Sequence, residues 1–328
     1  PRQKLFTYLL LWCMVGNMAT SFVTSWEQLK WVRFFCGMPH GVYLGMASII
    51  LTHSLPAQHH GKAIGVLMAG IGMALLLIVP LTTFIGEMQN WRIIFRFVAL
   101  IDLLIILLLH DLLPTLPQPP SKRGFGEIQV LKNPLVWWVL AISATAICGR
   151  MAIFAYAEPI VLHITHLPRH KLPLIVMCGG IGTVVGFLLG GYFADKNLHK
   201  TLLYSLVWFV VVIVLFNVFS HHDYLIYLGF FILGTFMLIV PALQVMSIRY
   251  APEGETFASC LNHAAINVAN AMGPLLASLL IGAGYGWLSS TWVGIGVGLI
   301  ALFVFMLVMV FLVPKVKPIQ PNLSAPPQ

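Results

Sequence analysis

The sequence predicts an all-α, polytopic membrane protein with about ten transmembrane helices, because its composition is apolar and its apolar residues form long runs. Hydrophobic residues make up 59% of the 328 residues and charged residues only 9%, whereas about 25% of the residues in a soluble domain are charged. A helix needs roughly 20 apolar residues to cross the hydrocarbon core of a bilayer, and it must satisfy its backbone hydrogen bonds internally. The runs of this length cover residues 5–23, 29–52, 61–86, 91–113, 133–156, 171–193, 200–219, 223–247, 255–283 and 288–313.

Lysine and arginine residues are distributed unevenly between the two sides of the predicted bundle. When alternate loops are assigned to alternate sides, one side carries eleven of them and the other carries three or four. Cytoplasmic loops normally carry this excess, so we expect both termini and the 114–132 loop in the cytoplasm. The net charge of +8 then reflects orientation in the lipid bilayer, and we expect no nucleic-acid partner.

Motifs for metal binding and enzymatic catalysis are absent from the sequence. The five cysteines are odd in number and include no C-x-x-C pair, which predicts neither disulfides nor a metal site. The histidine pairs His59-His60 and His221-His222 fall in loops, where they form no ligand set at the middle of the membrane. No H-E-x-x-H or G-x-S-x-G motif occurs, so we do not expect an enzyme.

The chain contains an internal repeat. The segment from Lys4 to Trp12 matches the segment from Lys200 to Trp208 at an offset of 196 residues, and Pro80-Leu81 matches Pro274-Leu275 at an offset of 194. At this offset, the first-half partners of the fifth and sixth helices would lie roughly 60 residues before position 1. We therefore predict two related six-helix halves, of which this sequence holds four helices and six, with a substrate site between them at mid-membrane. The expected parts are 1–113, the linker 114–132, 133–313 and a disordered cytoplasmic tail 314–328.

Three motifs resemble those of a known transporter family. Residues 33–41 match R-x-x-x-G-x-P-H-G, and Pro80 and Gly86 resemble an antiporter motif in the third helix. The segment from Gly191 to Lys196, followed by Lys200, resembles the second-half copy of a cytoplasmic gating motif. With the ten-helix layout, the chain resembles the major facilitator superfamily, and within it the arabinose-efflux-permease-like branch of the drug:proton antiporters.

This resemblance implies a function and a location. A family member of this branch exports sugars or small amphiphilic compounds across the bacterial inner membrane in exchange for entering protons, with the proton gradient as energy source and no cofactor. We expect a monomer when full length, although the sequence leaves the oligomeric state open. Two other readings remain open at this point: an inactive truncated transporter fragment that lacks two helices, and a membrane sensor or scaffold of transporter descent.

The second predicted helix presents Arg33, Gly37, Gly41 and Gly45 on one face, because they recur every four residues. Glycines on one face let another helix approach closely. A charge that faces lipid at mid-depth costs at least ~2.5 kcal/mol, so we expect Arg33 to point into the bundle and to orient substrate or assist a proton relay; the alternative is an arginine that snorkels to the membrane surface. His40 suits proton transfer or packing at a kink equally well.

Ionisable residues also interrupt the fourth and fifth predicted helices. Asp102 lies near the middle of its run, where a carboxylate binds protons or pairs with a group on another helix. Arg150, Tyr156 and Glu158 cluster near the end of the fifth run, where Pro159 is expected to loosen the helix. This cluster predicts a periplasmic gate, with ordinary interfacial residues as the alternative.

The sixth and ninth predicted helices carry the remaining candidates. Small residues in the sixth helix predict close packing, and Asp195, with Lys196 and Lys200 nearby, is expected to cap a neighbouring helix or pair with an arginine and so act in gating. The ninth helix carries a polar face in an apolar run, which predicts contacts either to sugar hydroxyls or to another helix. Its residues are Asn262, His263, Asn267 and Asn270.

Overall fold

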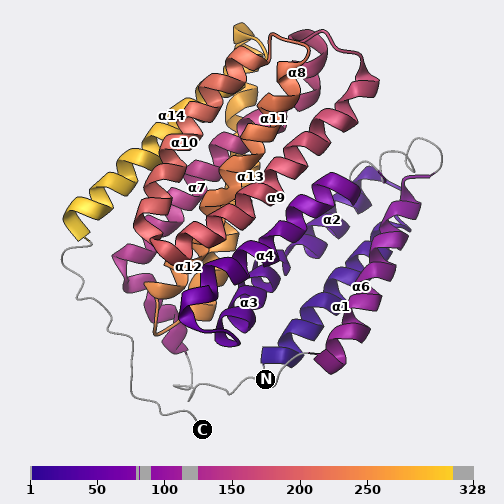
Figure 1. The fold of residues 1–328 in the computed structure, drawn as a ribbon. Helices are drawn as coiled ribbons and strands as arrows, with labels where there is room; N and C mark the ends of the chain where they lie inside the picture. Colours follow the sequence, from indigo (N-terminus) through magenta and orange to yellow (C-terminus); the bar gives the residue numbers. More distant parts are fainter. Residues whose placement is uncertain (1, 79–80, 82–89, 113–124, 313–328) are drawn as a thin grey trace.

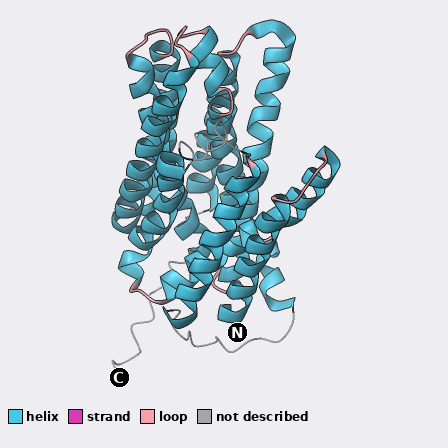
Figure 2. Ribbon diagram, turned by 90° about the vertical axis from the view of Figure 1, so that its right-hand side faces the viewer, coloured by secondary structure: helices cyan, strands magenta, loops and turns pink. Residues whose placement is uncertain are grey.

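The computed structural model describes residues 2–78, 81, 90–112 and 125–312, and within these ranges it contains helices and loops but no strand (Figures 1 and 2). Helices α1 to α6 form the N-terminal half, and α7 to α14 form the C-terminal half. The helices of the N-terminal half are α1 (Arg2–Thr20), α2 (Trp26–Gly37), α3 (His40–His53), α4 (His60–Met73) and α6 (Arg92–Leu112). Those of the C-terminal half are α7 (Pro134–Phe154), α8 (Ala157–His163), α9 (Leu172–Lys196), α10 (Leu198–Phe219), α11 (Leu225–Thr235), α12 (Ile239–Arg249), α13 (Glu255–Leu280) and α14 (Ser289–Leu307).

The described chain contains eight helical segments that are long and apolar enough to cross a membrane. This confirms an all-α, multi-pass membrane protein. The two other predicted spans are the helices α1 and α6, which are not among the eight. Polar residues lower their apolar character: Lys4 and Asn17 in α1, and Arg96 and Asp102 in α6.

The structure describes only part of the predicted linker 114–132 and none of the predicted tail 314–328. Residues 125–132 of the predicted linker form a short 3-10 segment, Phe125–Lys132. The rest of that linker lies outside the described residues, and so does the predicted tail 314–328. The 3-10 segment leads directly into α7, whose first turn is capped by the side chain of Asn133.

Two predicted helices are interrupted where proline removes a backbone donor. The run 29–52 divides into α2 and α3, with the break at Met38 and Pro39. The run 133–156 ends as α7 at Phe154, and the chain continues as α8 to His163. Pro159 lies in the first turn of α8. Because proline has no N–H group, it cannot donate to the carbonyl one turn earlier, and the helix breaks there, at Ala155 and Tyr156.

The C-terminal half holds most of the buried core. Its centre contains the fully buried rings of Phe187, Phe209, Phe216, Phe230 and Phe236, contributed by α9, α10, α11 and the turn after α11. The rings of Phe209 and Phe236 stack at 3.9 Å between centroids. Close packing of this kind is what holds membrane helices together where lipid supplies no hydrophobic driving force.

Glycines allow helix α9 to approach its neighbours on two sides. A Cβ atom added at Gly186 would lie 2.6 Å from the carbonyl oxygen of Thr235, next to α11. On the opposite side, a Cβ atom added at Gly61 of α4 would lie 2.5 Å from the carbonyl oxygen of Gly191. The small residues predicted to pack closely therefore do so on two sides of α9. Gly186 contacts α11 within the C-terminal half, and Gly191 contacts α4 of the N-terminal half.

The two halves meet mainly where α4 packs against α9 and α3 packs against α13, with a smaller contact between α4 and α12. In Figure 1, α3 and α4 lie between the C-terminal half and the outer pair formed by α1 and α6. A Cβ atom added at Gly45 of α3 would lie 2.7 Å from the backbone of Cys260 in α13. This close contact places residues of the second predicted helix directly against the polar face of the ninth.

Candidate functional site at the interface of the two halves

The α3–α13 interface brings together four of the predicted residues: His40 and Gly41 from α3, and His263 and Asn267 from α13. A Cβ atom added at Gly41 would lie 3.7 Å from the side-chain nitrogen of Asn267. His263 is 3% exposed, whereas His40, at the start of α3, is exposed. The glycine face of α3 thus packs against the polar face of α13.

His263 lacks a hydrogen-bond partner in the described part of the protein. Its Nε2 atom is buried and makes no hydrogen bond there. The side-chain amide of Asn267 also makes none of the hydrogen bonds seen among the described residues. Buried polar groups are nearly always paired, so the unpaired Nε2 of His263 at the interface of the two halves is a candidate for ligand binding.

Asn262 differs from its neighbour His263, because its amide is fully used within the protein. The hydroxyl of Ser143 donates to Asn262 Oδ1 at 2.6 Å, and Asn262 Nδ2 donates to Gln244 Oε1 at 2.7 Å. Gln244 in turn donates to the hydroxyl of Ser259, which donates to the carbonyl of Gly45 at 2.9 Å. Of the two predicted roles, Asn262 has the interhelical one in this conformation.

This network also contains three residues that sequence reasoning missed: Ser143, Gln244 and Ser259. All three are fully buried, and together they join α7, α12 and α13 to α3. Gln244 carried a signal, because it is a lone amide in the otherwise apolar stretch of α12. Serine gave none, since a membrane helix can bond a serine hydroxyl to its own backbone.

The predicted cluster at the end of the fifth run divides at the break between α7 and α8. Arg150 is 5% exposed, and its guanidinium lies over the ring of Phe154, 4.9 Å from the centroid. The Tyr156 hydroxyl donates to the carbonyl of Pro274 at 3.2 Å. Glu158 instead forms an ion pair with Arg169 at 2.9 Å. The break between α7 and α8 therefore separates Arg150 from Glu158.

Within the N-terminal half, Asp102 accepts a hydrogen bond from Asn17 of α1 at 2.9 Å, and the other side of that amide accepts one from Arg33 at 3.4 Å. This confirms a partner for Asp102 on another helix. Arg33 is exposed, which corrects the expectation of a buried cation. Helix α2 contains no buried residue because it packs mainly on α1. Gly37 on the same helix has no neighbour within 4 Å of an added Cβ atom.

At the lower end of the bundle in Figure 1, where α4 begins and α9 ends, Asp195 contacts the N-terminal half. Its carboxylate accepts hydrogen bonds from the backbone amides of Gly61 at 2.6 Å and Lys62 at 2.9 Å. These amides belong to the first turn of α4, where unpaired donors and the positive end of the helix dipole favour an anion. Asp195 therefore caps a helix of the opposite half.

The other residues of the gating motif have different contacts. The ammonium of Lys196 lies over the ring of Tyr192, 4.3 Å from the centroid, and Lys62 approaches the same ring at 5.3 Å. The Lys200 backbone amide donates to the side chain of Asn197 and so takes part in capping α10. Pro80 and Gly86, the other predicted gating residues, lie outside the described residues.

A second cross-half contact at the lower end was not predicted. His53 at the end of α3 lies 2.8 Å from the carboxylate of Glu255 in the first turn of α13. Their side chains are 38% and 32% exposed. Among the described residues, the hydrogen bonds that join the halves all involve residues 42–62 of the N-terminal half. Those of His53, Gly61 and Lys62 lie at the lower end, and those of Val42 and Gly45 lie farther up α3.

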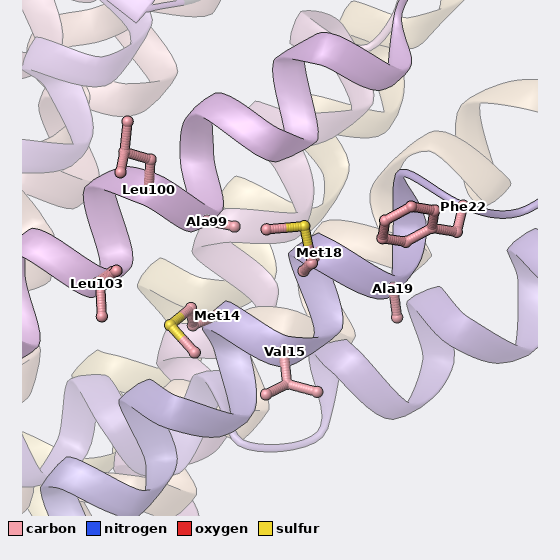
Figure 3. A pocket seen from close by; sticks show the side chains of 8 residues that line it. All are labelled: Met14, Val15, Met18, Ala19, Phe22, Ala99, Leu100 and Leu103. Atoms are coloured by element: carbon pink, nitrogen blue, oxygen red, sulfur yellow. The ribbon is translucent and has the colours of Figure 1, made fainter.

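A groove of about 460 Å³ on the outer face of α1 and α6 offers no comparable chemistry (Figure 3). Its lining is entirely apolar: Met14, Val15, Met18, Ala19, Phe22, Ala99, Leu100 and Leu103. The described residues contain no group of three or more His, Cys, Asp or Glu side chains arranged to hold a metal ion.

The chain is similar to proteins of one family. The family model described as Major Facilitator Superfamily matches residues 1–196 and, in a second match, residues 139–327. The chain is 27% identical over 310 residues to the "Probable sugar efflux transporter" of Helicobacter acinonychis, an alignment that covers 93% of this chain and 78% of the relative. It is 26% identical over 308 residues to the "Inner membrane transport protein YdhP" of Escherichia coli K12, covering 93% of this chain and 79% of the relative.

Two solved structures share its fold. The human organic anion transporter MFSD10 superposes with a TM-score of 0.74 at 16% identity, covering 93% of this chain and 77% of that protein. The proton:xylose symporter XylE superposes with a TM-score of 0.73 at 15% identity, covering 94% and 80%. At these identities the similarity concerns the arrangement of helices alone.

Proposed function

The chain belongs to the major facilitator superfamily and is a multi-pass membrane transporter rather than an enzyme, and we propose that it exports sugars or small amphiphilic compounds in exchange for protons. The observation that carries this proposal is the α3–α13 interface, where His263 is buried without a partner beside His40 and Asn267. In a transporter built from two halves, substrate and coupling ion bind where the halves meet.

The chemistry of this interface suits a hydroxylated substrate. An asparagine amide and a neutral imidazole each offer both a donor and an acceptor, which is what a sugar hydroxyl requires. Specific small-molecule sites place a few such groups in an otherwise apolar surround. The name of the Helicobacter relative, a probable sugar efflux transporter, supports the same substrate class.

The two histidines also suit proton coupling. Imidazole is the side chain that changes charge most readily near neutral pH. Because His40 and His263 belong to different halves, a proton on either would disfavour a proton on the other as long as the halves are together. We propose that proton entry at this pair favours separation of α3 from α13, and that proton release favours closure.

Alternation requires the lower-end contacts to break. We propose that this end is cytoplasmic, because the basic loops predict it, so that the structure represents a state closed to the cytoplasm. The Asp195 cap on α4 and the pair between His53 and Glu255 would then stabilise the outward-facing state. Opening towards the cytoplasm separates both contacts.

Proton-driven uptake into everted membrane vesicles tests the proposal. Vesicles with the full chain are compared with vesicles that lack it, using labelled arabinose and, separately, a lipophilic cation. We expect accumulation of at least one substrate, abolished by a protonophore. Accumulation that survives the protonophore would contradict proton exchange, and no accumulation of any sugar or amphiphile by folded, inserted protein would contradict export.

A further inference from the structure

Arg150 is a buried cation whose environment in the protein is incomplete. We propose that its guanidinium binds the carboxylate of an acidic substrate, such as a sugar acid. This inference rests on the proposed transport function for its biological meaning, but it concerns binding and is tested without a proton gradient.

No described acidic side chain neutralises Arg150. It lies in the membrane span Pro134–His163 and is 5% exposed, yet none of the ion pairs among the described residues includes it. Five of the described acidic residues have other partners. Glu27 pairs with Lys30, Glu158 with Arg169 and Glu255 with His53, while Asp102 bonds Asn17 and Asp195 caps α4.

The partners that Arg150 does have leave most of its donors unused. A guanidinium carries five N–H donors and cannot lose its charge in a protein. Here Nη1 reaches the sulfur of Met151 at 3.5 Å, the Phe154 ring covers one face, and Nε has no partner. A thioether is a weak acceptor, so the site lacks a strong one.

A carboxylate supplies what is missing. Its two oxygens match the planar fork of a guanidinium in two parallel hydrogen bonds, and such charge-assisted pairs are about twice as strong as neutral ones. The Phe154 ring already lies beside the guanidinium, with 4.9 Å between the central guanidinium carbon and the ring centroid. Arg150 is covered in this conformation, so access for the substrate requires the same movement of helices that alternating access provides.

The test compares two ligands that differ in one group, galacturonate and galactose. Equilibrium binding is measured on the full chain in lipid nanodiscs, for the wild type, Arg150→Gln and Arg150→Lys. The control is Arg249→Gln, which removes the same charge from an exposed residue at the end of α12. Thermal melting of each variant reports folding.

We expect the wild type and Arg249→Gln to bind galacturonate at least tenfold more tightly than galactose. Arg150→Gln should lose that preference while galactose binding stays within twofold. Arg150→Lys keeps the charge but loses the planar guanidinium, so it should retain part of the preference for galacturonate. If Arg150→Gln does not fold, the loss of this preference in Arg150→Lys tests the proposal instead.

Three outcomes would overturn the proposal. They are equal wild-type affinity for the two ligands, unchanged galacturonate preference in the Arg150 variants, and an equal loss of both ligands, which indicates a structural role. Chloride that competes with galacturonate at millimolar concentration and stabilises only proteins with Arg150 would assign the site to an inorganic ion instead. Neutral sugar export measured in vesicles is independent of all four results, so failure of the transport proposal is recognised separately.

Discussion

Asn262 and Asn267 lie on the same helix, yet the structure gives their amides different surroundings. Asn262 is fully buried and bonded to Ser143 and Gln244, whereas Asn267 faces α3 near Gly41. An amide with both of its groups paired contributes to packing of the helices. An amide with free groups at the interface of the halves is available to a ligand.

We predict that Asn262→Ala lowers stability and Asn267→Ala lowers substrate affinity. The first change leaves the buried groups of Ser143 and Gln244 without a partner, which costs about 1–3 kcal/mol. The second removes no hydrogen bond seen among the described residues. Thermal melting and substrate binding on both variants separate the two effects, and a stable Asn262→Ala protein with weakened binding would reverse the assignment.

Asp195 caps a helix of the opposite half, so its charge should matter more for cycling than for folding. Asp195→Asn keeps one acceptor but removes the attraction to the helix dipole, which is worth about 0.3–1 kcal/mol and up to ~2 kcal/mol when partly buried. We expect a melting temperature close to that of the wild type and a transport rate reduced several-fold. Unchanged transport would remove Asp195 from the gate. The control is Asp223→Asn, the same change at an exposed residue before α11.

At the scale of elements, the contact between α4 and α9 depends on the absence of side chains. The backbones approach so closely that a Cβ atom at Gly65 would lie 2.6 Å from the carbonyl of Phe187. Neither backbone can yield without moving its whole helix. The glycines therefore set the distance between the two halves on this side.

Gly65→Ala should accordingly weaken the closed state, whereas Gly37→Ala should not. Overpacking of this kind costs about 1–3 kcal/mol. Gly37 has open space around it, and alanine there improves helix propensity by up to ~1 kcal/mol. Spin-label distances between α4 and α9 would show a larger separation only in the first variant; an equal separation in both would mean that the contact does not control closure.

At the scale of the whole molecule, two contacts hold the lower end of the bundle together. The Asp195 cap joins α9 to α4, and the pair of His53 and Glu255 joins α3 to α13. They lie on different helix pairs, so each holds a different part of the interface between the halves. Opening has to release both.

We predict a modest coupling between His53 and Glu255 in a double-mutant cycle. When the imidazole is protonated, a partly exposed pair of this kind contributes about 0.2–1 kcal/mol, and salt weakens it. The cycle uses His53→Ala, Glu255→Ala and the double variant, with the closed fraction measured from spin-label distances at low and high salt. Strictly additive effects at low salt would show that the contact does not stabilise closure.

The sequence by itself determined which segments are helices in the membrane and which small residues and motifs recur along them. These properties are local, because a helix satisfies its own backbone and its apolar length decides whether it spans the bilayer. It also placed Gly41 on a small face of one helix, and His263 and Asn267 on a polar face of another. It did not determine which side chain meets which, because this depends on the rotation and tilt of each helix against its neighbours.

Only the tertiary structure decided those partners. It turned Asn262 towards Ser143 and Gln244, left Arg33 exposed on a helix with few neighbours, and separated Glu158 from Arg150 at a break in the helix. It also paired Asp195 with the first turn of α4. Where the partner of a polar group in a membrane span comes from another helix, no run of residues along the chain specifies its position.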